Sequence, residues 1–123
     1  MKRREHAAWY NDHLSKFEAL DLPVEKDDCL HVYQMYTIKL KGVDRTAFLA
    51  ELRKRGVGAS VHFDPPVHKQ PYYNDLLSGY RSDLSITEKV SASIITLPIY
   101  PTMTVKQLGY VVECIEATLL NLC

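Results

Sequence analysis

Residues 61–73, with the sequence VHFDPPVHKQPYY, hold the densest cluster of side chains that could take part in chemistry. The segment contains His62, His68 and Gln70, together with an aspartate, a lysine and two tyrosines. Its three prolines favour a stiff, extended path, and a stiff path pre-orders polar groups for binding. The segment is therefore predicted to be an ordered loop, which serves either as a surface crossover with local hydrogen bonds or as a binding loop.

Two sets of residues carry atoms that could ligate a metal or act as a nucleophile. The first set, His62, Asp64 and His68, has ligand types that suit zinc or iron, but two prolines separate the histidines, and the spacing matches no helical face. The second set, Cys29 and His31, has no partner pair elsewhere. We therefore predict neither a metal site nor a Cys–His nucleophile, and the five glycines include no phosphate-binding run.

The composition is that of one ordinary globular domain that spans residues 1–123. There are 15 basic and 15 acidic residues, and 46% of the chain is hydrophobic. Since the formal net charge is zero, no long-range field attracts nucleic acid. The apolar runs are far shorter than the roughly 20 residues of a membrane helix, and no export signal is expected. Three widely spaced cysteines indicate reduced thiols, so a cytoplasmic location is expected.

Helical periodicity and capping patterns predict the elements that must position this loop. The expected helices cover residues 3–20, 44–56, a short stretch at 72–77 that ends near Gly79, a segment behind the capping pattern of Ser85 and Glu88, and a segment from Thr104 to the C-terminus. In the helix behind Ser85, the apolar residues Ile86, Val90 and Ile94 are expected to face inward.

Three strands are predicted from β-branched and aromatic residues and from period-two alternation. They cover residues 30–40, residues 57–64, and the first part of SIITLPIYP, where Pro98 ends the strand. In the second strand Ser60 and His62 share one face. The predicted fold is α+β, with a small three- to four-stranded, mainly antiparallel sheet covered by helices on one face. The other face, with Ser60 and His62, meets water or a partner.

Four blocks in sequence order carry a family resemblance. They are RREHAAWYNDHL, HVYQMYTIKL with Arg45 following, GVGASVHFDPPVHKQPYY, and SIITLPIYPTMTVKQLGYVV. Together they resemble the C-terminal small domain of the pyridoxal-phosphate-dependent sugar-nucleotide aminotransferases of the DegT/DnrJ/StrS type. The resemblance runs from near residue 3 to near residue 118, and it implies the small domain of a fold-type I, aspartate-aminotransferase-like enzyme.

The resemblance also implies a division of labour between two domains. In the family a large domain carries the lysine that forms the internal aldimine and an aspartate that pairs with the pyridine nitrogen, and an amino group passes from glutamate to a keto sugar nucleotide. Those blocks have no counterpart here, so Lys39, Lys41 and Lys69 are not assigned as the cofactor lysine. The chain alone is expected to bind no pyridoxal phosphate and to be inactive.

The resemblance places the substrate side of the cleft at residues 62–73. It implies that His62, His68 and Gln70 contact the sugar or a phosphate, with a role in binding and closure rather than in proton transfer. For each of the three, a purely structural hydrogen bond is the competing interpretation.

Three functional hypotheses follow. In the first, the chain is the small-domain part of such an aminotransferase, with a separate large domain as partner, a nucleotide sugar as substrate and a place in lipopolysaccharide or polysaccharide biosynthesis. In the second, it is a stand-alone homo-oligomeric binding module without transaminase activity. In the third, it is an independent enzyme with His62 or His68 as general base.

Overall fold

A three-stranded antiparallel sheet lies at the centre of the structure, which is a computed structural model that describes residues 1–76 and 83–122. The elements are α1 (Lys2–Leu14), β1 (Leu20–Asp21), β2 (Tyr36–Leu40), α2 (Arg45–Lys54), the 3₁₀ helix η1 (Val67–Lys69), α3 (Pro71–Leu76), α4 (Ser85–Ser93), β3 (Ile94–Leu97) and α5 (Val105–Leu122). The α+β prediction is confirmed. Within the described residues, no helix is both long enough and apolar enough to cross a membrane.

The sheet has the order β1-β2-β3, and both strand pairs are antiparallel. Leu20 pairs with Leu40, and Tyr36 pairs with Leu97. Along β2 the buried residues alternate with half-buried or exposed ones, so only one face of the sheet is covered. The covered face carries the buried apolar side chains of both long strands, which are Tyr36, Ile38, Leu40, Ile95 and Leu97.

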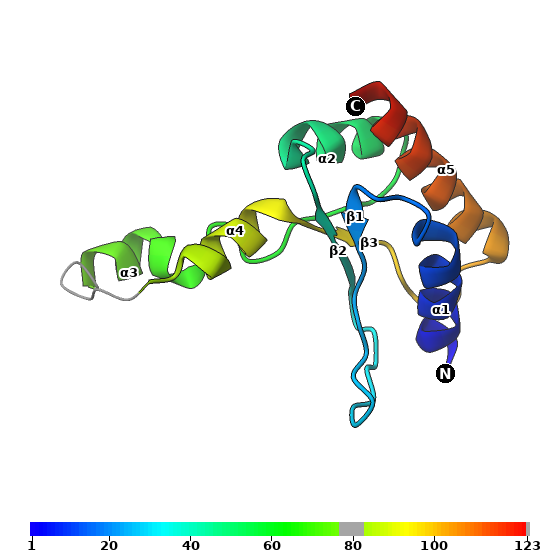
Figure 1. Cartoon of the computed structure of the whole chain (residues 1–123), viewed down its shortest axis with the longest axis horizontal. Helices are drawn as coiled ribbons and strands as arrows, with labels where there is room; N and C mark the ends of the chain where they lie inside the picture. The colour runs from blue at the N-terminus through cyan, green and yellow to red at the C-terminus, as the bar shows by residue number, and fades with distance from the viewer. Residues whose placement is uncertain (77–82, 123) are drawn as a thin grey trace.

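Helices α1, α2 and α5 cover this face and complete the core (Figure 1). Their fully buried side chains include Tyr10 of α1, Phe48 of α2 and Ile115 of α5. The Tyr36 hydroxyl donates to Asn11 Oδ1 at 2.6 Å, and the Tyr10 hydroxyl donates to the carbonyl of Pro98 at 3.0 Å, so the two rings satisfy their polar ends. Helices α3 and α4 project away from this core (Figure 1).

The prediction of a helix over residues 3–20 is wrong at its C-terminal end, because α1 ends at Leu14. Phe17 still packs against the core, and Leu20 is buried, but Leu20 belongs to β1. The backbone N–H of Phe17 donates to Leu14 and that of Leu20 donates to Phe17, each with a spacing of three residues. Tight turns with this spacing keep the apolar residues on the same side, so the sequence pattern imitates a longer helix.

The strand expected over residues 30–40 begins only at Tyr36. The reason is a turn at Tyr33, whose φ of 47° lies in the left-handed region, where its backbone N–H donates to Nδ1 of His31 at 2.9 Å. A strand cannot pass through such a residue. Leu30 and Val32, which precede the turn, are exposed.

The strand expected over residues 57–64 is reduced to a single bridge between Ser60 and Thr96. Val57 and Ala59 are buried, as the alternation predicted, but Phe63 has a φ of 57° and ends the extended path. The sheet therefore has three strands, as predicted, with β1 in place of the expected strand at 57–64.

Helix α4 exists as predicted, but the expectation that its apolar stripe faces inward is wrong. Ile86 is 77% exposed, and Val90 is also exposed, because α4 projects from the sheet rather than lying over it (Figure 1). The expected capping box does not form either. Asp83 accepts the backbone N–H of Ser85 at 3.0 Å, and Glu88 is engaged elsewhere.

Two other predicted caps are confirmed. Asp44 accepts the backbone N–H of Ala47 at 2.7 Å and starts α2, and Gly56 follows α2 with a φ of 76°. Before α5, Thr104 and Gln107 bond reciprocally, since each side chain accepts the other's backbone N–H. The short helix α3 begins at Pro71, and the end expected near Leu77 and Gly79 lies outside the described residues.

Candidate functional site

A sharp turn at Phe63 is the most unusual piece of backbone in the loop that the sequence analysis singled out. Phe63 has a φ of 57°, and its side chain is 74% exposed. A left-handed conformation is uncommon for a bulky residue without a short polar side chain, so surrounding contacts must hold it. The exposed ring adds apolar surface that a ligand or a partner could cover.

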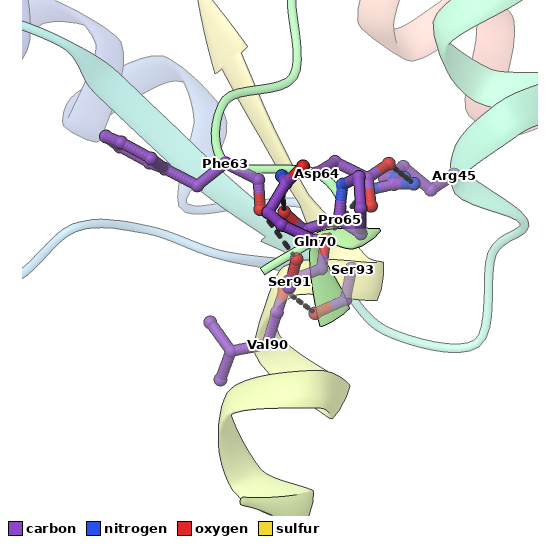
Figure 2. A network of polar contacts seen from close by, with 8 residues as sticks. All are labelled: Arg45, Phe63, Asp64, Pro65, Gln70, Val90, Ser91 and Ser93. Carbon is purple, nitrogen blue, oxygen red and sulfur yellow. Dashed lines mark hydrogen bonds and ion pairs between the residues drawn. The ribbon is translucent and has the colours of Figure 1, made fainter. Parts of the chain in front are cut away.

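Arg45 lies beside Asp64, on the side away from the Phe63 ring, and bonds to this turn (Figure 2). Its guanidinium donates through Nη1 to the carbonyl of Ser91 at 2.6 Å and through Nη2 to Oδ2 of Asp64 at 2.6 Å. The Ser91 hydroxyl then donates to the carbonyl of Phe63 at 3.2 Å. The Arg45 side chain is only 17% exposed, so these charge-assisted bonds are partly shielded from water. The network joins α2, the turn and the end of α4.

His68 and Gln70 fasten the same loop at a second point. Nε2 of His68 lies 3.1 Å from Oε1 of Glu88 on α4, and the ammonium of Lys69 lies 2.6 Å from the other carboxylate oxygen. The Lys69 ammonium, followed by the His68 imidazole, holds the pKa of Glu88 below its ordinary value of 4.5. The Gln70 amide donates to the carbonyl of Pro65 at 2.7 Å (Figure 2).

His62 stands apart from these fastening contacts. It is exposed, and its Nε2 lies 3.0 Å from Oγ of Ser60, so the two side chains lie on the same side, as predicted. Ser60 pairs with Thr96, and the Thr96 hydroxyl lies 3.0 Å from that of Thr37. Paired residues of antiparallel strands point to the same face, so a row of polar side chains from Thr37 to His62 crosses the face of the sheet opposite the core helices.

The structure thus separates the three predicted site residues into two groups. His68 and Gln70 are engaged by Glu88 of α4 and by the carbonyl of Pro65, whereas His62 is exposed to a ligand. No contact joins His62 to either of the other two within the described chain. Likewise, no group of three metal-ligating side chains occurs in residues 1–76 and 83–122.

Sequence reasoning missed the roles of Phe63, Arg45 and Ser91. A left-handed phenylalanine has no local signal in the sequence, because its conformation is imposed by residues 18 and 28 positions away along the chain. Arg45 follows the N-cap Asp44, a position that also suits an ordinary exposed side chain.

Lys39, Lys41 and Lys69 do not fit the role of a pyridoxal phosphate lysine. A lysine that forms a Schiff base needs a free amine in a desolvated pocket. Lys39 and Lys41 are instead about half exposed and lie 3.0 and 3.2 Å from Asp21, and Lys69 is paired with Glu88. These three lysines form surface ion pairs, and we assign no step of cofactor chemistry to them.

The comparisons with known proteins agree with this architecture. The chain belongs to the DegT/DnrJ/EryC1/StrS aminotransferase family, whose family model matches residues 1–116. It is 31% identical over 115 residues to the dTDP-3-amino-3,6-dideoxy-alpha-D-galactopyranose transaminase of Aneurinibacillus thermoaerophilus, covering 94% of this chain and 30% of that protein. It is 29% identical over 120 residues to the spore coat polysaccharide biosynthesis protein SpsC of Bacillus subtilis, covering 94% of this chain and 31% of that protein.

The fold matches part of solved aminotransferases. The crystal structure of NtdA from Bacillus subtilis, determined with the bound cofactor PMP, superposes with a TM-score of 0.83 and 27% identity, covering 97% of this chain and 28% of that one. The chain therefore spans about 30% of the length of the relatives that it matches. It is homologous to one portion of the sugar aminotransferases.

Proposed function

We propose that this chain forms the small domain of a pyridoxal-phosphate-dependent sugar-nucleotide aminotransferase and supplies residues on the substrate side of the cleft. The cofactor and its lysine belong, in this proposal, to a larger part that corresponds to the remaining length of the relatives. The named relatives act on a dTDP-linked amino sugar or take part in polysaccharide biosynthesis, which supports a nucleotide sugar as substrate and a biosynthetic role.

The observation that carries the proposal is the pair His62 and Phe63 at the held turn. Both side chains are exposed, yet the backbone beneath them is fixed by Arg45, Asp64 and Ser91. A fixed backbone lowers the entropy cost of binding, because the groups that contact the ligand are already in place. The imidazole can hydrogen-bond a sugar hydroxyl or a phosphate oxygen, and the ring can cover an apolar sugar face.

The apolar surface beside this turn supports coverage by the larger part. Phe63, Pro66, Ile86, Val90 and Ile94 line a shallow cavity of about 320 Å³. Phe63 and Ile86 are mostly exposed in the described chain, and contiguous exposed apolar surface commonly marks an interaction site. In this proposal the larger part packs there and brings its cofactor toward His62.

Reconstitution in trans tests the proposal. The A. thermoaerophilus transaminase, with the matching 30% of its chain removed, is mixed with this chain, and 2-oxoglutarate formation from glutamate is followed. We expect activity only when both parts are present, and a loss of at least about tenfold with His62→Ala, the cost of about one charge-assisted hydrogen bond. His13→Ala, an exposed histidine on α1, is the matched control. Failure of the two parts to associate, or full activity of His62→Ala, contradicts the proposal.

A stand-alone homo-oligomeric module is the second candidate, and the exposed stripe on α4 favours it. In that case two copies cover Ile86 and Val90 mutually. Sedimentation velocity decides between the two: a stable oligomer of the lone chain that dissociates with Ile86→Ser supports the module, and a monomer supports the split enzyme. General-base catalysis by the lone chain has less support, because His62 has only Ser60 as its hydrogen-bond partner among the described side chains.

A further inference from the structure

A second cavity in the described part of the chain lies away from the turn at Phe63. It has a volume of about 790 Å³ and lies between residues 56–58, the connection from β3 to α5, and the first turns of α5. None of its lining residues belongs to the loop of residues 61–70. We refer to it as the α5 pocket. Cavities of 300–1,000 Å³ are typical of small-molecule sites.

The α5 pocket combines an apolar floor with two aromatic walls. Val57, Met103 and Val111 on the floor are each less than 8% exposed. Tyr100 and Tyr110 on the walls are 41% and 50% exposed, so a ligand could reach their rings. Flat apolar rings favour a flat partner, because stacking buries the largest area at little entropy cost.

Positive charge lies at the rim. Lys106 lines the pocket and forms no ion pair with any residue of the described ranges. Beside it, the Tyr110 hydroxyl donates to the carbonyl of Arg55 at 2.7 Å, and Nε of Arg55 is buried without a hydrogen-bond partner there. The Lys106 ammonium is the charged group in the lining of the pocket, and it favours an anion.

We propose that the α5 pocket is a binding site for a planar aromatic anion of the nucleoside monophosphate class. The base lies against Tyr100 and Tyr110 over the apolar floor, and the phosphate faces Lys106. This site goes beyond the proposed function, because it shares no residue with the held turn at His62 and Phe63.

Titration of the ¹⁵N-labelled full chain with uridine monophosphate tests the proposal. We expect saturable amide shifts at Gly58, Tyr100 and Lys106, with a Kd of about 1 mM or below. Uridine and inorganic phosphate are titrated in parallel, because uridine lacks the phosphate that faces Lys106 and inorganic phosphate lacks the base that stacks on the tyrosines. Both are expected to bind more weakly than the monophosphate at the same amides.

Two variants separate the ring contact from the charge contact. Lys106→Gln is expected to weaken binding of uridine monophosphate about fivefold, the scale of an exposed ion pair, and to leave uridine unaffected. Tyr100→Ala is expected to weaken both ligands. Both side chains are exposed, so neither change should disturb folding, which circular dichroism checks; Lys89→Gln on α4 is the matched control.

The outcomes divide clearly. Shifts that fail to saturate by about 10 mM, equal binding by Lys106→Gln and the unaltered chain, or shifts confined to Ile86 and Val90 each overturn the proposal. Saturable shifts at the α5 pocket that respond to both variants support it. None of these results depends on transaminase activity, so the outcome is independent of the reconstitution test.

Discussion

At the scale of single residues, Arg45 is the side chain on which the conformation of the candidate site depends. Its two bonds reach residues from different elements, Asp64 in the turn and Ser91 at the end of α4. A carboxylate and a carbonyl that lose a charged donor in a partly buried site are left poorly satisfied. The guanidinium of Arg45 therefore stabilises the turn at Phe63 through Asp64 and Ser91.

Arg45→Met is expected to lower the free energy of unfolding by about 1–3 kcal/mol, because it removes two charge-assisted hydrogen bonds and keeps most of the apolar stem. Urea denaturation followed by far-UV circular dichroism measures the change. Lys54→Met is the control, since that lysine is 72% exposed and pairs only with its helix neighbour Glu51, and little change is expected. Equal losses in both variants would refute the assigned role of Arg45.

Glu88 gives the site a dependence on pH. Because Lys69 and His68 hold its folded pKa below 4.5, its contribution to stability is present above pH 4.5 and is lost as the pH falls through the folded pKa. Glu88→Gln removes the carboxylate, so the difference in unfolding free energy between the unaltered chain and this variant is expected to shrink below pH 4.5. Other carboxylates titrate in the same window but cancel in this difference. A constant difference from pH 7 to pH 3 would argue against the ion pairs.

At the scale of elements, the start of α5 is the most strongly specified helix terminus. Thr104 and Gln107 satisfy each other's backbone N–H groups, and the helix behind them carries much of the core. A helix end of this kind sets where the buried stripe begins, and with it the position of Leu108 and Ile115 against the sheet.

Thr104→Ala is expected to lower the free energy of unfolding by about 1 kcal/mol, since a backbone N–H at the helix start loses its acceptor. Thermal and urea unfolding both report this change. Thr102→Ala, two residues earlier and exposed, is the matched control and is expected to be neutral. A neutral Thr104→Ala would mean that water replaces the cap without cost.

The elements also show which parts of the fold the sequence could predict and why the other parts could not be predicted. Helices α2 and α5 were predictable because caps and apolar spacing act within a few residues. The early ends of the strands were not, since they depend on the left-handed backbone at Tyr33 and Phe63. For α4 the periodicity predicted the helix, but it could not predict that the apolar stripe would be exposed. The exposure of His62 follows from the alternation of residues 57–62, whereas its separation from His68 depends on how the loop folds back onto Glu88.

At the scale of the whole molecule, the chain consists of a well-packed core and a projecting pair of helices. The core helices bury their apolar stripes, whereas α4, which projects from the core (Figure 1), leaves its stripe exposed. This uneven distribution agrees with the proposed function, in which a larger part covers the remaining apolar surface.

Ile86→Ser separates folding from association. Because Ile86 is exposed, its replacement is expected to change the unfolding free energy of the lone chain by less than about 0.5 kcal/mol, and to weaken association with the larger part of the transaminase. Pull-down of that part measures association. Ile115→Ala is the contrasting variant, because it creates a cavity in the core and is expected to lower the free energy of unfolding by about 2–5 kcal/mol. A large loss of stability with Ile86→Ser would show that α4 packs inward in solution.

The borders of the sheet bear on how the protein behaves when concentrated. On one side the outermost strand, β1, is two residues long, and on the other a lone bridge at Ser60 gives way to the kink at Phe63. In the described ranges, neither edge of the sheet presents a long extended strand with which a strand of another molecule could pair. We therefore expect any aggregates of this protein to be amorphous and to form through exposed apolar helix surfaces. Such aggregates should not increase the fluorescence of amyloid-binding dyes.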